Sequence, residues 1–265
     1  MTLQADSAQL RNVAAGARMP LRQIIQEVLA VVPRVRAFTN NPGHKYCTVY
    51  YDQVTKQPTH YTINYEDGDL GNLVHELTHV RCNEVYALDS LNYVSPNRNA
   101  TDLPDRVLLA DGRCQNEQER HHKLRDPAKD VLLATQAQQI SAWANAANEL
   151  SAEQKQKIVN QIMYLSGKPF MEFDTVMNQI LVWLHEWGWP QAYTGAKPVA
   201  NALYEEVEKI VAYQYRRRQL GLPPAPPARA GRPPLGGHGA PPPVPSRAGR
   251  PPLPSRRPLP PLPKR

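Results

Sequence analysis

Cysteine is scarce in this 265-residue chain, which has three cysteines and no CxxC pair. Because Cys47, Cys82 and Cys114 cannot all pair within one chain, we expect reduced thiols in a protein made in a cytoplasm. No apolar run approaches the length of a membrane span. The first 18 residues lack the apolar stretch of a secretory signal, so we expect any export to use a specialised route.

Acidic residues are absent after Glu208, and eight basic residues lie between Arg229 and the last residue, Arg265. Without these eight cations, 23 basic residues face 24 acidic ones, so the body of the protein is close to neutral. The formal charge of +7 therefore belongs to residues 221–265, here named the tail. This distribution gives no support for a specific nucleic-acid surface on the folded part.

The chain divides by composition into three parts. Residues 1–19 are small and polar and are predicted to be disordered, and the tail holds about two-thirds of the 27 prolines, which predicts an extended, disordered segment. Between them, residues 20–220 predict one α+β domain with a sheet and active-site part (20–126) and a helical part (127–220). The patterns predict a hairpin of strands 46–51 and 60–65, helices at 21–33, 70–88, 151–165, 170–187 and 198–220, and one or two helices within 127–150.

The segment His75-Glu76-Leu77-Thr78-His79 contains the pattern HExxH within a predicted helix. Residues four apart lie on the same face of a helix, so His75 and His79 can direct two imidazole nitrogens at one metal ion. Glu76 lies about 100° around the helix from His75, where its carboxylate can act as general base on a water. The motif predicts a metal-dependent hydrolase.

This segment resembles the active-site helix of the zincins, a superfamily of zinc metallopeptidases, because a strand pair directly precedes the HExxH helix. The resemblance implies a zincin-like fold, one Zn²⁺ ion and peptide-bond hydrolysis with Glu76 as general base. The compact chain without a standard signal also resembles metallopeptidase effectors and toxins that bacteria secrete into host or target cells. The resemblance thus implies a secreted protein with a protein substrate.

The third metal ligand is not fixed by the motif. A metzincin would place a glycine and a third histidine after His79, and this chain has neither. Glu84 falls about 180° from His75 if the helix continues. In gluzincins a downstream helix supplies a glutamate, often preceded by asparagine, and Asn116-Glu117 resembles that pair, with Glu119 as the alternative. Cys114 remains a less favoured ligand.

The tail contains a repeat, with residues 229–235 recurring as residues 247–253, and it carries motifs that resemble ligands of SH3 domains. Such ligands present two prolines and one cation in a polyproline II helix. Four segments match PxxPx-Arg, and Arg257 begins a match in the opposite orientation. The matches are Pro224, Pro227 and Arg229; Pro242, Pro245 and Arg247; Pro251, Pro254 and Arg256; and Pro260, Pro263 and Arg265.

Two functions follow as hypotheses. The first is a zinc metalloendopeptidase that holds its metal with His75, His79 and Glu117 and is targeted by the tail. The alternative is a non-catalytic adaptor or scaffold that recruits SH3-domain proteins through the tail, with a structural HExxH helix.

Overall fold

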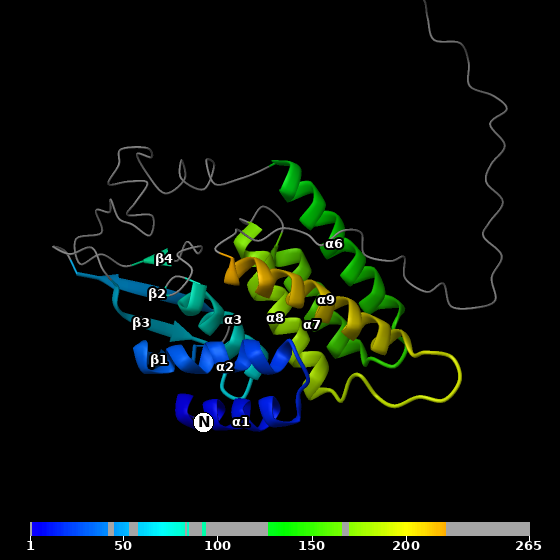
Figure 1. The fold of residues 1–265 in the computed structure, drawn as a ribbon, viewed down its shortest axis with the longest axis horizontal. Helices are drawn as coiled ribbons and strands as arrows, with labels where there is room; N and C mark the ends of the chain where they lie inside the picture. Colours follow the sequence, from blue (N-terminus) through cyan, green and yellow to red (C-terminus); the bar gives the residue numbers. More distant parts are fainter. Residues whose placement is uncertain are drawn as a thin grey trace, which may run out of the picture. The chain divides into compact units, whose positions relative to one another are not determined.

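A sheet of four strands and a set of helices make up the described part of the chain (Figure 1). The computed structural model describes residues 2–41, 45–52, 58–82, 84, 92–93, 127–165 and 170–220. Its elements are α1 (Leu3–Gly16), α2 (Leu21–Val31), a 3₁₀ turn (Val32–Arg34), β1 (Val35–Thr39), β2 (Tyr46–Tyr51), β3 (Pro58–Asn64), α3 (Leu70–Arg81), β4 (Asn92–Tyr93), α6 (Pro127–Ala146), α7 (Ala152–Tyr164), α8 (Phe170–Glu186) and α9 (Val199–Gln219). The mixture of a small sheet and many helices confirms the α+β class.

The sheet has the strand order β1-β3-β2-β4. The predicted hairpin is confirmed, since β2 and β3 pair antiparallel, with Cys47 opposite Ile63 and Val49 opposite Tyr61. These four side chains are all buried, so the register places one apolar face against the helices. The sheet extends beyond the predicted antiparallel hairpin and is mixed, because β1 joins β3 in parallel and β4 joins β2 in parallel.

The N-terminal segment also differs from its prediction, because residues 3–16 form helix α1 instead of a disordered stretch. The helix is anchored by Asp6, which is fully buried and accepts hydrogen bonds from the Tyr65 hydroxyl at 2.9 Å and the Gly68 amide at 3.3 Å. Leu10, on the same helix, is fully buried as well. A segment with few large apolar residues is thus held in place partly by a buried polar contact, which periodicity alone does not reveal.

Helix α3, which carries HExxH, packs on α8 on one side and on α2 and the two central strands on others. Every residue from Leu70 to Val80 is buried as a result. The helix begins at an N-cap, Asp69, whose side chain accepts a hydrogen bond from the Asn72 amide. It ends at Arg81, and the predicted continuation to residue 88 falls mainly outside the described residues.

The helical part follows its predicted pattern closely. Ser151 and Gln154 form the predicted capping box at the start of α7. Helix α8 lies between α3 and α9 in contact with both (Figure 1), and its apolar side chains from Phe173 to Leu184 are buried. Among the described residues, no helix is both long and apolar enough to cross a membrane. The tail, with its proposed SH3 ligands, lies outside the described residues.

Candidate metal centre

Two histidines of α3 lie one helical turn apart and face each other. The Nε2 atoms of His75 and His79 are 3.3 Å apart, and each residue is 7% exposed. Their positions follow from HExxH on a regular helix, where residues four apart share a face. Both side chains are nearly removed from solvent because α8 covers this face of α3.

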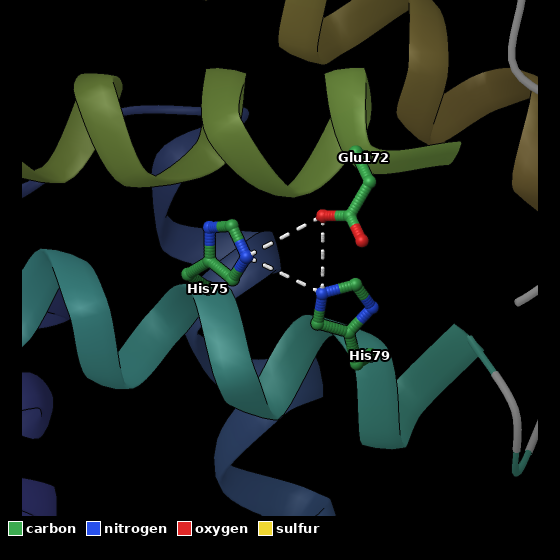
Figure 2. Close-up of side chains that lie close together, drawn as sticks. All are labelled: His75, His79 and Glu172. Carbon is green, nitrogen blue, oxygen red and sulfur yellow. Dashed lines mark hydrogen bonds and ion pairs between the residues drawn. The ribbon is translucent and has the colours of Figure 1, made fainter. Parts of the chain in front are cut away.

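The third member of the cluster, Glu172, comes from the first turn of α8. Its Oε2 atom lies 3.7 Å from His75 Nε2 and 3.5 Å from His79 Nε2. Figure 2 shows the carboxylate above the two rings, so that three donor atoms from two helices point at one another. The Glu172 side chain is 18% exposed, so the cluster is accessible at this corner. His75, His79 and Glu172 together could hold a metal ion.

The dimensions of this triangle fit a tetrahedral metal centre. Bonds of about 2.0–2.2 Å to imidazole nitrogen and carboxylate oxygen give donor–donor distances of about 3.3–3.6 Å in a tetrahedron. The three distances are 3.3, 3.5 and 3.7 Å. An octahedral centre with the same bonds needs donors about 2.8–3.1 Å apart. The distances are closer to those of a tetrahedral centre than to those of an octahedral one, and the three residues could hold a metal ion.

His75 is oriented by a hydrogen bond on its other ring nitrogen. Its Nδ1 atom lies 2.8 Å from Oε1 of Gln179, an atom that only accepts, so Nδ1 carries the proton and Nε2 presents its lone pair to the cluster. Thr175 Oγ1 lies 3.4 Å from the same Nε2 and donates at 2.8 Å to the carbonyl oxygen of Glu172. These contacts fix the ring in a position suited to metal binding.

The electrostatic surroundings keep His75 neutral. Burial is the main cause that lowers the pKa of His75 to about 4, and the neighbouring His79 lowers it further. Glu172 and the hydrogen bond to Gln179 oppose this shift without reversing it. A histidine with this pKa is uncharged at neutral pH, which is the form that binds a metal ion.

Glu76, the predicted general base, is 3% exposed on α3 between the two histidines. Its buried carboxylate is an unusual feature for a helix residue, because glutamate is rarely buried without a partner or a chemical role. The positive charge of Lys45 interacts with both Glu76 and His75. Its catalytic role stays a prediction.

The predicted third ligands divide into two groups. Glu117, its alternative Glu119, and Cys114 lie outside the described residues, so the prediction stands as a prediction. Glu84 is directed elsewhere, because its Oε1 accepts from the Tyr61 hydroxyl at 2.7 Å and pairs with Arg34 at 3.3 Å. This position agrees with the expectation that Glu84 does not reach the metal.

Sequence reasoning missed Glu172, which the structure places in the cluster. A usable signal was present in α8, the most apolar of the predicted helices. Glu172, Thr175 and Gln179 are spaced three and four residues apart, which puts three polar side chains on one face of a buried helix. All three contact His75. A polar stripe on an apolar helix thus marks the face that meets HExxH.

Of the predicted reduced cysteines, Cys47 and Cys82 are buried and form no disulfide. Cys114 lies outside the described residues.

Comparison with known proteins adds no family assignment, since no family model, curated protein or solved structure matches the chain.

Proposed function

We propose that the protein is a zinc-dependent metalloendopeptidase. The observation that carries the proposal is the triangle of His75, His79 and Glu172, whose dimensions match a tetrahedral ion. Two imidazoles and one carboxylate are a ligand set typical of catalytic zinc sites, which keep a fourth position for water or substrate. The sequence HExxH adds Glu76 beside the first histidine, as hydrolysis requires.

In this mechanism each residue has a distinct task. His75, His79 and Glu172 would hold a zinc ion, and a bound ion would supply Lewis-acid activation of a peptide carbonyl and of a water. Glu76 would take a proton from the attacking water and deliver it to the leaving amine. Gln179 keeps the Nε2 lone pair of His75 available. Both histidines are nearly buried, whereas the Glu172 side chain is partly exposed, so the cluster can be reached from that side.

A direct test changes Glu76 to glutamine. We expect Glu76→Gln to retain its zinc and to lose cleavage of an unfolded protein substrate, because the amide cannot accept the proton. Glu153→Gln, on the exposed face of α7, is the matched control and should leave both quantities unchanged. Unchanged cleavage by Glu76→Gln would overturn the mechanism.

The third ligand has a test of its own, because Glu172 and Glu117 are both candidates. Zinc content is measured by mass spectrometry in Glu172→Gln, Glu117→Gln and Glu119→Gln purified in parallel. We expect only Glu172→Gln to lose zinc, since its carboxylate lies within 3.7 Å of both histidine nitrogens. Loss of zinc in Glu117→Gln alone would restore the ligand that the gluzincin resemblance implies.

We further propose that the enzyme is a secreted effector whose tail binds SH3 domains in a target cell. Support comes from the sequence, where arginine recurs at the same offset after four PxxP motifs, for example Arg247 after Pro242 and Pro245. Tandem motifs on one segment raise avidity through effective concentration. Deletion of residues 222–265 should abolish capture by an SH3-domain panel and leave cleavage of an unfolded substrate intact.

The alternative is an adaptor without catalysis, which the tail motifs alone would support. It predicts a purified protein that contains no zinc and binds SH3 domains. Zinc analysis of the full chain separates the two functions, because only the peptidase requires metal at the His75 and His79 pair.

A further inference from the structure

A chain of polar side chains leads from His75 away from the metal cluster and ends at a carboxylate. His75 Nδ1 lies 2.8 Å from Gln179 Oε1, and Gln179 Nε2 donates to Asn72 Oδ1. Asn72 Nδ2 in turn donates to Asp69 Oδ2. Gln179 is on α8, whereas Asn72 and His75 are on α3 and Asp69 caps that helix, so the chain crosses the interface twice. These four residues are named the polar chain below.

The direction of every hydrogen bond in the polar chain follows from its last member. An ionised carboxylate accepts and never donates, so Asn72 must turn its amide nitrogen toward Asp69 and its oxygen toward Gln179. Gln179 must then turn its nitrogen toward Asn72 and its oxygen toward His75. The only group that suits this oxygen is a protonated Nδ1 on His75, which leaves Nε2 without a proton.

Asp69 is well suited to anchor the chain because four donors surround it. Its Oδ1 accepts from the Asn72 amide at 2.9 Å and from Trp183 Nε1 at 2.7 Å, and its Oδ2 accepts from Asn72 Nδ2 and pairs with Lys157 at 2.8 Å. Burial acts to raise the pKa of Asp69, but hydrogen bonds from Lys157, Asn72 and Trp183 outweigh burial and lower it. The carboxylate therefore stays ionised at neutral pH.

We propose that the polar chain selects the ring tautomer of His75, and that Asp69, which touches neither metal nor substrate, thereby sets the metal affinity of the site. Gln179, Asn72 and Asp69 are positioning residues in this scheme. The affinity part rests on the proposed metal site, whereas the tautomer part concerns the metal-free protein and stands independently of it.

The decisive variant is Asp69→Asn, which preserves the size of the side chain and is expected to reverse the direction of the hydrogen bonds along the polar chain. An amide at position 69 can keep its oxygen toward the α3 amide and Trp183, and its nitrogen then faces Asn72. The partly exposed Lys157 ammonium, which pairs with Asp69 Oδ2 in the wild type, must then turn to solvent. The side-chain amides of Asn72 and Gln179 then both flip, so that Gln179 presents its nitrogen to His75. Because this nitrogen only donates, the His75 proton moves from Nδ1 to Nε2. The variant is expected to invert the tautomer without removing any side chain that contacts His75.

The tautomer is measured by long-range proton–nitrogen correlation on metal-free protein labelled with ¹⁵N-histidine at pH 7, with the His75 signals assigned from a His75→Gln variant. We expect Nδ1–H in the wild type and Nε2–H in Asp69→Asn. Gln179→Met, which cannot hydrogen-bond, is the second variant and should show both tautomers. Asn178→Ala is the matched control, because it removes a hydrogen bond of 3.2 Å from α8 to Thr78 of α3 and leaves the polar chain intact.

Zinc affinity is measured on the same proteins by competition with a chromophoric chelator. Loss of outer hydrogen-bond partners typically weakens metal binding about 10–100-fold, and we expect this loss in Asp69→Asn and Gln179→Met but not in Asn178→Ala. A wild-type His75 protonated on Nε2, or an Asp69→Asn variant that keeps both the wild-type tautomer and affinity, would overturn the proposal. Absence of zinc binding in the wild type with the expected tautomers would instead refute the proposed function, and the affinity part with it, and would leave the tautomer part standing.

Discussion

Replacement of Gly71 by alanine tests how closely α3 and α8 must approach to build the site. A Cβ at position 71 would lie 2.3 Å from Trp183 Nε1 and 2.5 Å from Trp183 Cδ1. Ordinary contacts between such atoms are about 3.5–4.0 Å, so the indole must move by more than about 1 Å. Trp183 is 2% exposed and stacks on Trp187, so the surrounding core resists this movement.

Three contributions determine how much Gly71→Ala should lower the free energy of unfolding. Overpacking of a core typically costs about 1–3 kcal/mol. Displacement of the indole also weakens its hydrogen bond to the Asp69 carboxylate, 2.7 Å long, at about 1.5–3 kcal/mol. Alanine regains about 1 kcal/mol through its higher helix propensity. We therefore expect Gly71→Ala to lower the free energy of unfolding by about 2–4 kcal/mol, or the melting temperature by about 5–15 °C for a domain of this size.

Chemical denaturation of the full chain measures this change against two comparisons. Gly16→Ala is the control, because a Cβ at Gly16, the last residue of α1, meets no atom within 4 Å and should be neutral or slightly stabilising. Trp183→Leu removes the clashing ring, so Gly71→Ala should cost at least about 1 kcal/mol less in that background. If Gly71→Ala lowers the free energy of unfolding equally in the wild type and in Trp183→Leu, the steric argument is refuted.

Three further predictions concern metal binding and charge. Saturating zinc should raise the melting temperature of the wild type, by the equivalent of about 2.7 kcal/mol at a hundred times the dissociation constant, and Glu172→Gln should abolish the rise in a thermal shift assay. Glu84→Gln should lower the free energy of unfolding by about 1–2 kcal/mol, because it weakens the contacts with Tyr61 and Arg34, and a changed zinc affinity in this variant would contradict the assigned geometry. Burial raises the pKa of Tyr204 to about 12, so its neutral form stabilises the fold below pH 10, the ordinary pKa, and this stabilisation is lost as pH rises toward 12. The difference in unfolding free energy between wild type and Tyr204→Phe should therefore fall by about 1 kcal/mol from pH 9 to pH 11 in urea denaturation, and a constant difference would refute it.

The sequence predicts those elements whose signals are local. Pro33 follows the observed end of α2 at Val31, and Ser151 caps α7, because proline and capping residues act on the turn in which they stand. The apolar periodicity of α8 likewise predicts that Phe173 and Leu184 are buried. His75 and His79 share a face for the same local reason.

Structural features that depend on contacts between residues far apart in the chain cannot be predicted from local sequence patterns. Helix α1 has local signals in its N-cap Thr2 and in Leu3 and Leu10, but its attachment through Asp6 depends on Tyr65, which lies 59 residues away. The parallel pairing of β1 and β3 depends on how the chain crosses between them. Glu172 was missed because HExxH does not specify which later helix packs on α3, and a glutamate at the start of a helix has an ordinary explanation in the helix dipole.

The distance along the chain between the two halves of the cluster has a consequence during biosynthesis. A ribosome that adds about 5–20 residues per second needs about 5–20 s to pass from His79 to Glu172, 93 residues later. During this interval the nascent chain carries HExxH but no Glu172, and the face of α3 that α8 covers has nothing to pack against. The cluster gains Glu172 only after α8 has been made, so on the proposed function a nascent chain or a truncated product that ends before α8 should be inactive.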